Sequence, residues 1–430
     1  MRRLLLTATL LTCVQATPAF AQDRRTVVEP RLPASACVTL KPGGGNRAAD
    51  IQAALKTCAG KVVRLSAGQY DSGPIEIPSA TTLWIDKGAV LAAIPDPALF
   101  DDGTHACGTI DKKGKACRPL LHIADATDVA IVGDGVIEGN GGKSMAGGTE
   151  TWWQLARRAQ VEKGNQNVPR LIVADRGRNF TLYRVRLANS PNFHVVANRL
   201  QGFTAWGVIV DSPEYARNTD GIDPGASDDV TITKTYIRTG DDNVAIKAGK
   251  TGGTHYVSIL DNHFYSGHGM SIGSETNGGV AHVLVKDLTI DGTTSGLRIK
   301  SDVSRGGLVA DVHYENVCIR SSKRPIDLYT AYDKGAVGSL IPQYRAIVFR
   351  NVEGDTGRLI ANGYDAAHPL ELYLDNVRFA PGAKWETVNA RFEIGKGGAS
   401  PDPNATTAAT AQATPSDRCK AAFVPFPERR

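Results

Sequence analysis

The sequence of 430 residues predicts an all-β fold, a parallel β-helix in which the chain coils into a solenoid. A strand pattern recurs at intervals of roughly 25–35 residues, which is the range of solenoid repeats. No helical periodicity separates its copies, so crossover helices cannot join the strands as they do in βαβ units. Consecutive strands must therefore stack by coiling, and such an elongated fold can exceed the size of one compact core.

Each copy of the repeat alternates apolar and polar residues, then places a polar residue before a second short apolar run. This pattern predicts a strand, a bend and another strand. Asp or Asn at the bend tolerates a left-handed backbone and can stack in ladders between coils. The copies span residues 180–187, 230–237, 257–264, 283–290, 312–319, 347–352 and 372–379, with bends at Asp261, Asp287, Asn316, Asn351 and Asn376.

The two ends and one insertion depart from the repeat. Residues 48–55 have helical spacing and are expected to cover the open end of the first coil. A Gly-rich insertion contains residues 152–155 (Trp-Trp-Gln-Leu), either a short helix beside a binding cleft or a segment packed on the coil. Residues 397–416 are rich in Gly, Ala, Thr and Pro. We expect a β-helix domain over residues 22–395 and a loosely ordered tail over 396–430.

The N-terminus has the features of an export signal over residues 1–21. A basic start, an apolar stretch at 4–14 and Ala-Phe-Ala at 19–21 fit a leader that is cleaved before Gln22. A lipoprotein signal that uses Cys13 is an alternative with a short apolar core. No later apolar run is long enough to span a bilayer. The sequence therefore predicts a secreted protein that passes through the periplasm.

Beyond the leader, the chain has an even number of cysteines, which predicts disulfides in an oxidising compartment. Proximity favours two local bridges and leaves one that pins the C-terminal tail, although other connectivities are open. The expected pairs are Cys37–Cys58, Cys107–Cys117 and Cys318–Cys419. The chain lacks the CxxC pairs typical of zinc sites. Its net charge of +5 is too small to argue for nucleic acid but is compatible with an anionic substrate.

Five short polar motifs follow one another along the repeat, about one per coil. Adjacent coils lie about 4.8 Å apart, so side chains on neighbouring coils can reach the same sugar. Each motif alone is weak, since an Asp pair is usually a turn and a run of Asp residues could bind calcium. Their shared order predicts a catalytic cleft for an acidic polymer. The motifs are Asn218-Thr-Asp-Gly221, Gly240-Asp-Asp-Asn243, Gly267-His-Gly269, Arg298-Ile-Lys300 and Tyr332.

The carboxylates can supply the acid and base of a glycosidase. Asp241 and Asp242 are adjacent, so a regular strand would point them to opposite faces. Gly240 permits a bend that brings both to one cleft. Two neighbouring carboxylates disfavour simultaneous ionisation, so one of them is expected to keep its proton to higher pH. Asn218 and Asp220, two residues apart, face the same way.

The cationic motif suits a substrate carboxylate. Arg298 and Lys300 are two residues apart, with Ile299 turned to the core, so both cations are expected to face outward. His268 lies between two glycines, which are expected to clear room for a ligand.

Together the motifs resemble those of the polygalacturonases of glycoside hydrolase family 28, in particular the secreted endopolygalacturonases of bacteria. The resemblance is densest over residues 217–224, 240–247, 267–275 and 296–302. It implies a right-handed parallel β-helix of the pectin-lyase type and hydrolysis of α-1,4 bonds in polygalacturonate with inversion, with endo action favoured. One departure is Asn243, where many relatives have Cys; no consequence for the mechanism is expected.

The resemblance also implies a role for each matching residue. Asp241 would be the general acid, and Asp220 and Asp242 would hold and activate the attacking water. His268 would tune the protonation of the acid. Spacing alone does not choose between inversion and retention. The residues implied to bind substrate are Arg298 and Lys300 through the uronate carboxylate, Tyr332 through the sugar ring, and Asn218.

Four alternative functions fit parts of the same pattern. They are an exo-acting polygalacturonase with inserted loops that close the groove, a rhamnogalacturonan hydrolase, a calcium-dependent pectate lyase and a non-enzymatic polysaccharide-binding β-helix. The intact His268 and Arg298/Lys300 pattern argues against the rhamnogalacturonan enzyme. The favoured hypothesis needs no metal or other cofactor and no membrane or nucleic-acid partner, and it expects a monomer.

Overall fold

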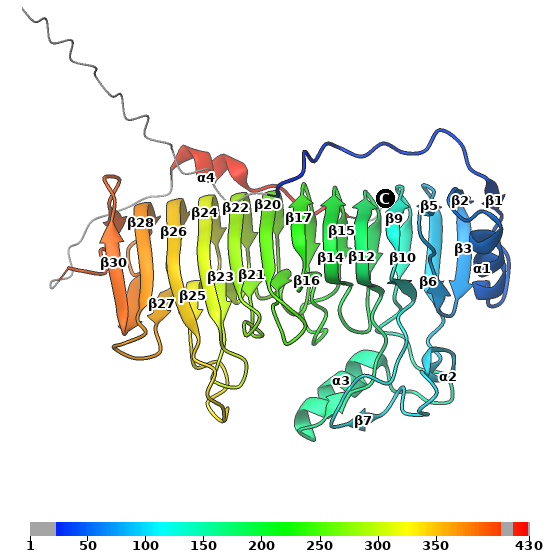
Figure 1. Cartoon of the computed structure of the whole chain (residues 1–430), viewed down its shortest axis with the longest axis horizontal. Coiled ribbons are helices and arrows are strands. Elements are labelled where there is room, and N and C mark those ends of the chain that lie inside the picture. The colour runs from blue at the N-terminus through cyan, green and yellow to red at the C-terminus, as the bar shows by residue number, and fades with distance from the viewer. Residues whose placement is uncertain (1–22, 406–415, 429–430) are drawn as a thin grey trace, which may run out of the picture.

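The computed structural model describes residues 23–405 and 416–428. The leader predicted over residues 1–21 lies outside this described part. Within it, 29 strands form one large sheet in which all strand pairings are parallel, while β7 and β11 form a separate antiparallel ribbon. The chain coils into an elongated β-helix (Figure 1), which confirms the fold class predicted from the repeat.

Successive coils contribute strands to three stacks, here called A, B and C. Several long strands bend at a corner and belong to two stacks. Stack A consists of β4 (Ile75–Glu76), β8 (Leu121–Ala124), the first halves of β12 (Ile172–Tyr183) and β14 (Val195–Trp206), β16 (Ile222–Gly225), β19 (Val244–Ile246), β21 (Met270–Ile272), β23 (Ser295–Lys300), β25 (Arg324–Tyr329), β27 (Arg358–Asn362) and β29 (Lys384–Val388).

Stacks B and C complete each coil. Stack B consists of β1 (Val38–Leu40), β2 (Val62–Leu65), β5 (Thr82–Ile85), β9 (Thr127–Val132), the second halves of β12 and β14, β17 (Asp228–Thr233), the first parts of β20 (Thr254–Phe264), β22 (Val280–Asp291), β24 (Leu308–Arg320), β26 (Gln343–Gly354) and β28 (Leu370–Phe379), and β30 (Ala390–Ile394). Stack C consists of β3 (Gly68–Ser72), β6 (Ala89–Ala93), β10 (Val136–Glu138), β13 (Arg186–Ala188), β15 (Ile209–Asp211), β18 (Tyr236–Arg238), the last parts of β20, β22, β24, β26 and β28, and β31 (Ala399–Ser400).

The interior of the coils is a series of apolar columns. In stack A the strand register places one apolar residue of each coil on the next, and all of them are fully buried. Each such side chain contributes about 1.5–3 kcal/mol on burial, so the columns are the main source of stability. The stack A column consists of Ile222, Val244, Met270, Leu297, Ile326 and Leu359.

The corners between stacks B and C carry the Asp and Asn residues that the repeat placed at its bends. All five have φ between 53° and 55°, the left-handed region expected for a sharp corner. Their side chains form a ladder along the solenoid. In this ladder Asn316 Nδ2 donates to Asp287 Oδ1 (2.9 Å), Asn351 Nδ2 donates to Asn316 Oδ1 (3.0 Å), and Asn376 Nδ2 donates to Asn351 Oδ1 (2.8 Å).

The first coil is covered as predicted. Helix α1 (Ala48–Thr57) buries Ile51 and Leu55 against it, and the helix lies at the blue end of the solenoid in Figure 1. The three expected disulfides are confirmed, with Cα–Cα separations of 6.0, 5.0 and 5.4 Å in the order Cys37–Cys58, Cys107–Cys117 and Cys318–Cys419.

A lobe with two helices projects from one side of the early coils (Figure 1). It contains α2 (Pro97–Phe100), α3 (Trp152–Val161), β7 (Ile110–Asp111) and β11 (Asn165–Gln166). Helix α3 begins with a capping box between Thr151 and Gln154. Trp153 donates through Nε1 to the carbonyl of Ser190, 2.9 Å away. The insertion is therefore a short helix that also packs on the coil.

Near the C-terminus, the described residues 416–428 include α4 (Asp417–Ala422), which lies beside β24 and is joined to it by the Cys318–Cys419 disulfide. The division into a domain over 22–395 and a tail over 396–430 stays a prediction. Over the ranges 23–405 and 416–428, the chain has no helix with the length and apolar character of a membrane span.

Candidate active site

The sequence motifs lie where consecutive coils enter or leave stack A. The strands β16, β19, β21, β23 and β25 are neighbours in that order. The spacing of the motifs therefore gives the expected arrangement of one motif per coil. Asp220 precedes β16, Asp241 and Asp242 precede β19, His268 precedes β21, Arg298 and Lys300 lie in β23, and Tyr332 follows β25.

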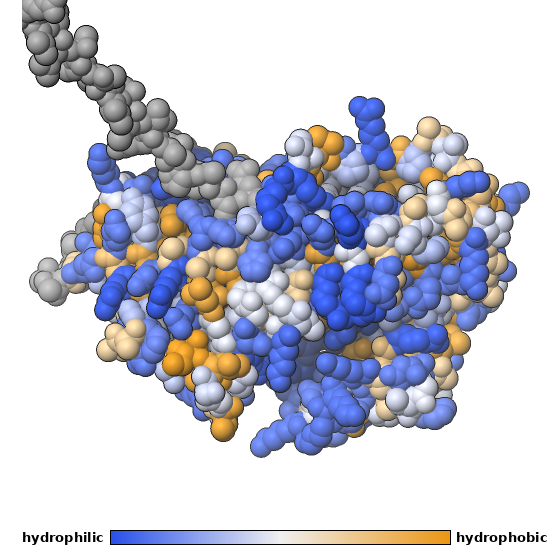
Figure 2. All heavy atoms as spheres, in the orientation of Figure 1, coloured by the Kyte–Doolittle hydropathy of each residue, from blue (hydrophilic) through white to orange (hydrophobic). Residues whose placement is uncertain are grey.

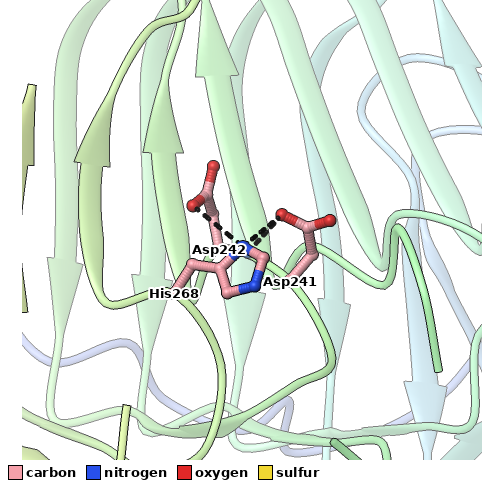
Figure 3. Close-up of side chains that lie close together, drawn as sticks. All are labelled: Asp241, Asp242 and His268. Atoms are coloured by element: carbon pink, nitrogen blue, oxygen red, sulfur yellow. Dashed lines mark hydrogen bonds and ion pairs between the residues drawn. The ribbon is translucent and has the colours of Figure 1, made fainter. Parts of the chain in front are cut away.

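His268 lies between the two adjacent carboxylates (Figure 3). Its Nδ1 is 3.0 Å from Asp241 Oδ1 and 3.9 Å from Asp242 Oδ1. Asp241 also accepts a hydrogen bond from the backbone N–H of Asp242, at 2.9 Å. The bend of the chain before β19 thus brings both carboxylates to one side, as expected, and the imidazole faces them from the next coil.

Asp242 lies buried at the base of the site. Its side chain is only 2% exposed, and its Oδ2 accepts a hydrogen bond from Lys300 Nζ at 2.7 Å. Its Oδ1 accepts from Ser271 Oγ at 2.7 Å and from Arg298 Nη1 at 3.4 Å. Asp242 is therefore a fixed carboxylate, and each of its oxygens accepts at least one hydrogen bond.

Asp220 is also buried but has fewer partners. Its Oδ2 is 3.4 Å from Lys247 Nζ, which lies closer to Asp223, at 2.7 Å. The Oδ1 atom of Asp220 is buried without a hydrogen-bond partner among the described residues. Lys247 thus lies beside two buried carboxylates, and the Oδ1 acceptor of Asp220 has no hydrogen bond among the described residues.

These surroundings separate the pKa values of the carboxyl groups. Burial, followed by the charges of Asp223 and Asp241, raises the pKa of Asp220 well above its usual range. Burial raises the pKa of Asp223 to about 6, although Lys247 opposes it. These shifts identify the carboxyls that keep their protons to higher pH.

The pKa shifts contradict the expectation that one member of the Asp241–Asp242 pair keeps its proton to higher pH. Burial alone would raise the pKa of Asp241, but the hydrogen bond and charge of His268 and the charge of Lys300 outweigh it and hold that pKa below its usual range. Burial alone would also raise the pKa of Asp242, but the charges of Lys300 and Arg298 outweigh it and lower that pKa. The neighbouring cations outweigh the repulsion between the two carboxylates.

The cations of β23 face the outer side of stack A while Ile299 is fully buried in the core, as expected. Their side chains are nevertheless buried, with 7% of Arg298 and 6% of Lys300 exposed. Burial alone would lower the pKa of Lys300, but Asp242 outweighs it and raises that pKa. Both cations are therefore charged and largely covered rather than projecting into solvent.

The glycines of the motifs serve backbone packing. A Cβ atom on Gly240 would come within 2.1 Å of the carbonyl oxygen of Ala216, and one on Gly269 within 2.2 Å of that of Gly296. Gly269 also has φ of 76°. The close approach of neighbouring coils therefore requires glycine at these positions. That the glycines beside His268 also clear room for a ligand stays a prediction.

A cavity of about 460 Å³ lies over these coils. Figure 2 shows the surface hollowed between the α3 lobe and the coils. Asp241, His268, Arg298 and Tyr332 line the cavity, whereas Asp220 and Asp242 lie beneath its surface. Further lining residues are Arg157, Gln160, Glu214, Arg217, Asn218, Gly240, Gly267 and Thr294.

Asn218 and Tyr332 lie on opposite sides of the acidic cluster. Asn218 Nδ2 donates to Asp241 Oδ2 at 3.4 Å, while its Oδ1 accepts from Gln166 Nε2 at 2.9 Å. The Tyr332 ring is 40% exposed. Lys300 Nζ lies 5.2 Å from the centre of that ring, so the ring covers the buried cation.

A calcium site is not supported by the donor set. Donor atoms of Asp241, Asp242 and His268 lie within 4.8 Å of one another. However, Ca²⁺ takes six to eight oxygen ligands, and the Asp242 oxygens already accept from Lys300 and Ser271. The cluster is arranged for proton chemistry beside cations.

Several residues of the site escaped the sequence analysis. Arg157 and Gln160 reach the cavity from α3, and Arg217 and Glu214 reach it from the turn before Asn218. Arg217 could have been found, since it directly precedes Asn218. The side on which α3 docks is set by tertiary packing, so no local pattern places Arg157 and Gln160 at the cleft.

Comparison with known proteins gives consistent matches. The family model described as "Glycosyl hydrolases family 28" matches residues 75–392. An endo-polygalacturonase of Pectobacterium parmentieri is 46% identical over 87% of this chain and 94% of that protein. An endo-polygalacturonase of Pectobacterium carotovorum subsp. carotovorum is 45% identical over 86% of this chain and 93% of that protein.

Solved structures give the same fold. The polygalacturonase from Erwinia carotovora ssp. carotovora has a TM-score of 0.84 and 44% identity, over 86% of this chain and all of that one. An exopolygalacturonase from Thermotoga maritima has a TM-score of 0.68 at 20% identity, over 85% of this chain and 94% of that one, and this likeness concerns the fold alone.

Proposed function

The chain belongs to glycosyl hydrolase family 28, and we propose that it is a secreted, monomeric polygalacturonase that hydrolyses internal α-1,4 bonds of polygalacturonate with inversion. The observation that carries this proposal is a cavity lined by Asp241, His268 and Arg298, with the buried side chains of Asp220, Asp242 and Lys300 directly beneath it. Relatives of this size that are 45–46% identical bear the name endo-polygalacturonase, which supports internal cleavage.

Asp241 is assigned as the general acid because it alone of the three carboxylates lines the cavity. Although burial would raise the pKa of Asp241, His268 and Lys300 outweigh it and lower that pKa. A bound galacturonate brings a carboxylate to Lys300 and offsets that positive charge. The pKa of Asp241 then rises, so that it can hold the proton for the leaving oxygen.

Asp220 and Asp242 are assigned to the attacking water. Asp242 is held ionised by Lys300 and Arg298 and can accept the proton of water. The nearest oxygens of Asp241 and Asp242 are within 4.8 Å, less than the roughly 6.5–9.5 Å of an inverting pair. Asp220, on the neighbouring coil with a free acceptor, is therefore needed to seat the water away from the acid.

The remaining residues orient the sugar. Arg298 and Lys300 bind the uronate carboxylate as charge-assisted donors. Tyr332 covers both cations and contacts the sugar ring. Asn218 and His268 hold the two oxygens of Asp241 and so fix the direction in which it delivers its proton.

The test is simultaneous measurement of viscosity and reducing ends with purified protein on polygalacturonate. Endo hydrolysis predicts a steep viscosity fall at low reducing-end release, without unsaturated product and without loss of activity in chelator. Slow viscosity loss with release of single galacturonates would overturn endo action. Unsaturated, chelator-sensitive product would overturn hydrolysis in favour of a lyase.

A further inference from the structure

Arg217 lines the cavity next to Asn218, in the turn before β16, whereas Arg298 lines it from β23, three strands further along stack A. It is half-buried, yet no carboxylate in the described ranges forms an ion pair with it. Its hydrogen bonds are long and both use Nη1, to the carbonyl of Ala156 at 3.5 Å and to Gln166 Oε1 at 3.3 Å. The Nε and Nη2 donors of this guanidinium remain available.

A second arginine reaches the same end of the cavity from α3. Arg157 Nη1 donates to Gln160 Oε1 at 2.8 Å, and its Nη2 donates to the carbonyl of Tyr215 at 3.2 Å. Glu214 also lines the cavity, but within residues 23–405 and 416–428 it forms no ion pair with either arginine. The guanidinium groups of Arg157 and Arg217 thus line one cavity, and neither has an ion-pair partner among the described residues.

This arrangement is electrostatically incomplete. Burial lowers the pKa of Arg217, and the charge of Arg157 lowers it further, while Asp241 opposes both. Like charges in a partly desolvated place repel each other, and an anion between them removes the repulsion. The cavity therefore favours a negatively charged group at this end.

Helix α3, which carries Arg157, is held firmly in place. The helix begins with a capping box and buries Trp152 and Leu155. Trp153 is bonded to the coil, and its ring meets Tyr215 edge-on at 5.7 Å between centroids. Arg157 also bonds the Tyr215 carbonyl, so the helix and the turn before Asn218 hold each other in place.

Along stack A, the two cationic ends lie on either side of the acid. The turn with Arg217 is one coil before Asp241, and β23 with Arg298 is two coils after it. From this geometry we infer that Arg217 and Arg157 form a second subsite for a uronate carboxylate, across the scissile bond from Arg298 and Lys300.

This inference rests on the proposed polygalacturonase activity and adds a selectivity to it. A carboxylate at the second subsite can accept hydrogen bonds from both guanidinium groups. A methyl ester has no charge and cannot replace it. The cleft therefore selects segments with free galacturonate on both sides of the bond that is cleaved.

The test compares Arg217→Gln and Arg157→Gln with wild type on polygalacturonate and on pectins of increasing methyl-esterification. We expect kcat/KM on polygalacturonate to fall about tenfold or more in Arg217→Gln, mainly through KM, and less in Arg157→Gln. The preference for unesterified substrate should shrink in both. The matched control is Arg391→Gln, an exposed arginine of β30, which should change neither quantity.

Arg217→Lys separates a binding role from a structural one. A subsite predicts partial recovery of kcat/KM and of the preference for unesterified substrate, with Tm unchanged in both variants at this position. The inference is overturned if Arg217→Gln keeps the wild-type preference, or if Lys and Gln are equally impaired together with a lower Tm. Wild-type protein that does not hydrolyse polygalacturonate would instead overturn the proposed function.

Discussion

At the scale of single residues, the three aspartates differ in their surroundings more than in their sequence context. The pattern located Asp220, Asp241 and Asp242 and placed them on neighbouring coils. It could not predict which carboxyl keeps its proton, because that depends on cations brought in from other coils. Lys300 lies 58 residues from Asp242 in sequence and 2.7 Å from it in space.

Asp223 gives a pH dependence with a definite sign. Its pKa rises from 3.8 unfolded to about 6 folded, so between these values the folded protein binds more protons and loses stability as pH rises. About two units correspond to about 3 kcal/mol at most. We expect Asp223→Asn to gain stability relative to wild type between pH 4 and pH 7, measured as the difference in Tm.

The control for this prediction is Asp333→Asn, a substitution at an exposed aspartate in the turn after Tyr332. Its Tm difference from wild type should stay constant over the same pH range. A constant difference for Asp223→Asn as well would contradict the assigned protonation of the buried carboxyl.

At the scale of elements, the strands and corners were predictable and the lobe was not. Apolar alternation and polar bends repeat in every coil, so each copy supports the others, and the Asn ladder followed from the same residues. The insertion with α3 occurs once and has no repeat to align with. The capping box predicts where helix α3 begins, but it does not predict which surface of the β-helix α3 packs against.

Asn243, for which the sequence predicts no consequence for the mechanism, lies between the turn of Asp241 and the turn of His268. Its Oδ1 accepts from the N–H of Gly269 at 2.9 Å, and its Nδ2 donates to the carbonyls of Ser266 and Ile237, each at 3.1 Å. The side chain thus ties the turn of Asp241 to the turn of His268. A cysteine thiol is only a weak donor and a weak acceptor, so it would hold the two turns less firmly.

We expect Asn243→Ala to lower kcat on polygalacturonate and to destabilise the protein by about 1–3 kcal/mol, because a buried N–H loses its acceptor. The matched control is Asn262→Ala at another corner, where Asn262 accepts from Thr235 N–H and donates to Ile232, both at 2.9 Å. The control should lose similar stability and keep kcat. Equal kcat in the two variants would contradict a positioning role for Asn243.

At the scale of the whole molecule, the C-terminal segment spans several coils. After α4, Val424 accepts a hydrogen bond from Tyr265 Oη at 2.9 Å, and Glu428 forms an ion pair with Arg238 at 3.2 Å. Pairing by proximity predicted the two local disulfides and left the third by elimination. The course of the segment was not predictable, because its sequence lacks the repeat.

The Cys318–Cys419 bridge closes a separation of 101 residues and is the covalent anchor of this segment. We expect Cys318→Ser with Cys419→Ser to expose residues 417–428 to limited proteolysis at rates well above wild type, while kcat changes less than twofold. The control, Cys37→Ser with Cys58→Ser, should leave proteolysis of this segment unchanged. Equal protection of the segment in both double variants would show that noncovalent contacts suffice to hold it.

The central claim is that Asp241 gives the proton to the leaving oxygen, and steady-state hydrolysis of polygalacturonate by Asp241→Asn tests it most directly. The amide keeps the size and acceptor of the carboxyl, so the fold should be retained, with Tm within about 2 °C of wild type. We predict that kcat falls about 10²–10⁴-fold or more. A folded Asp241→Asn variant with kcat within tenfold of wild type would contradict it.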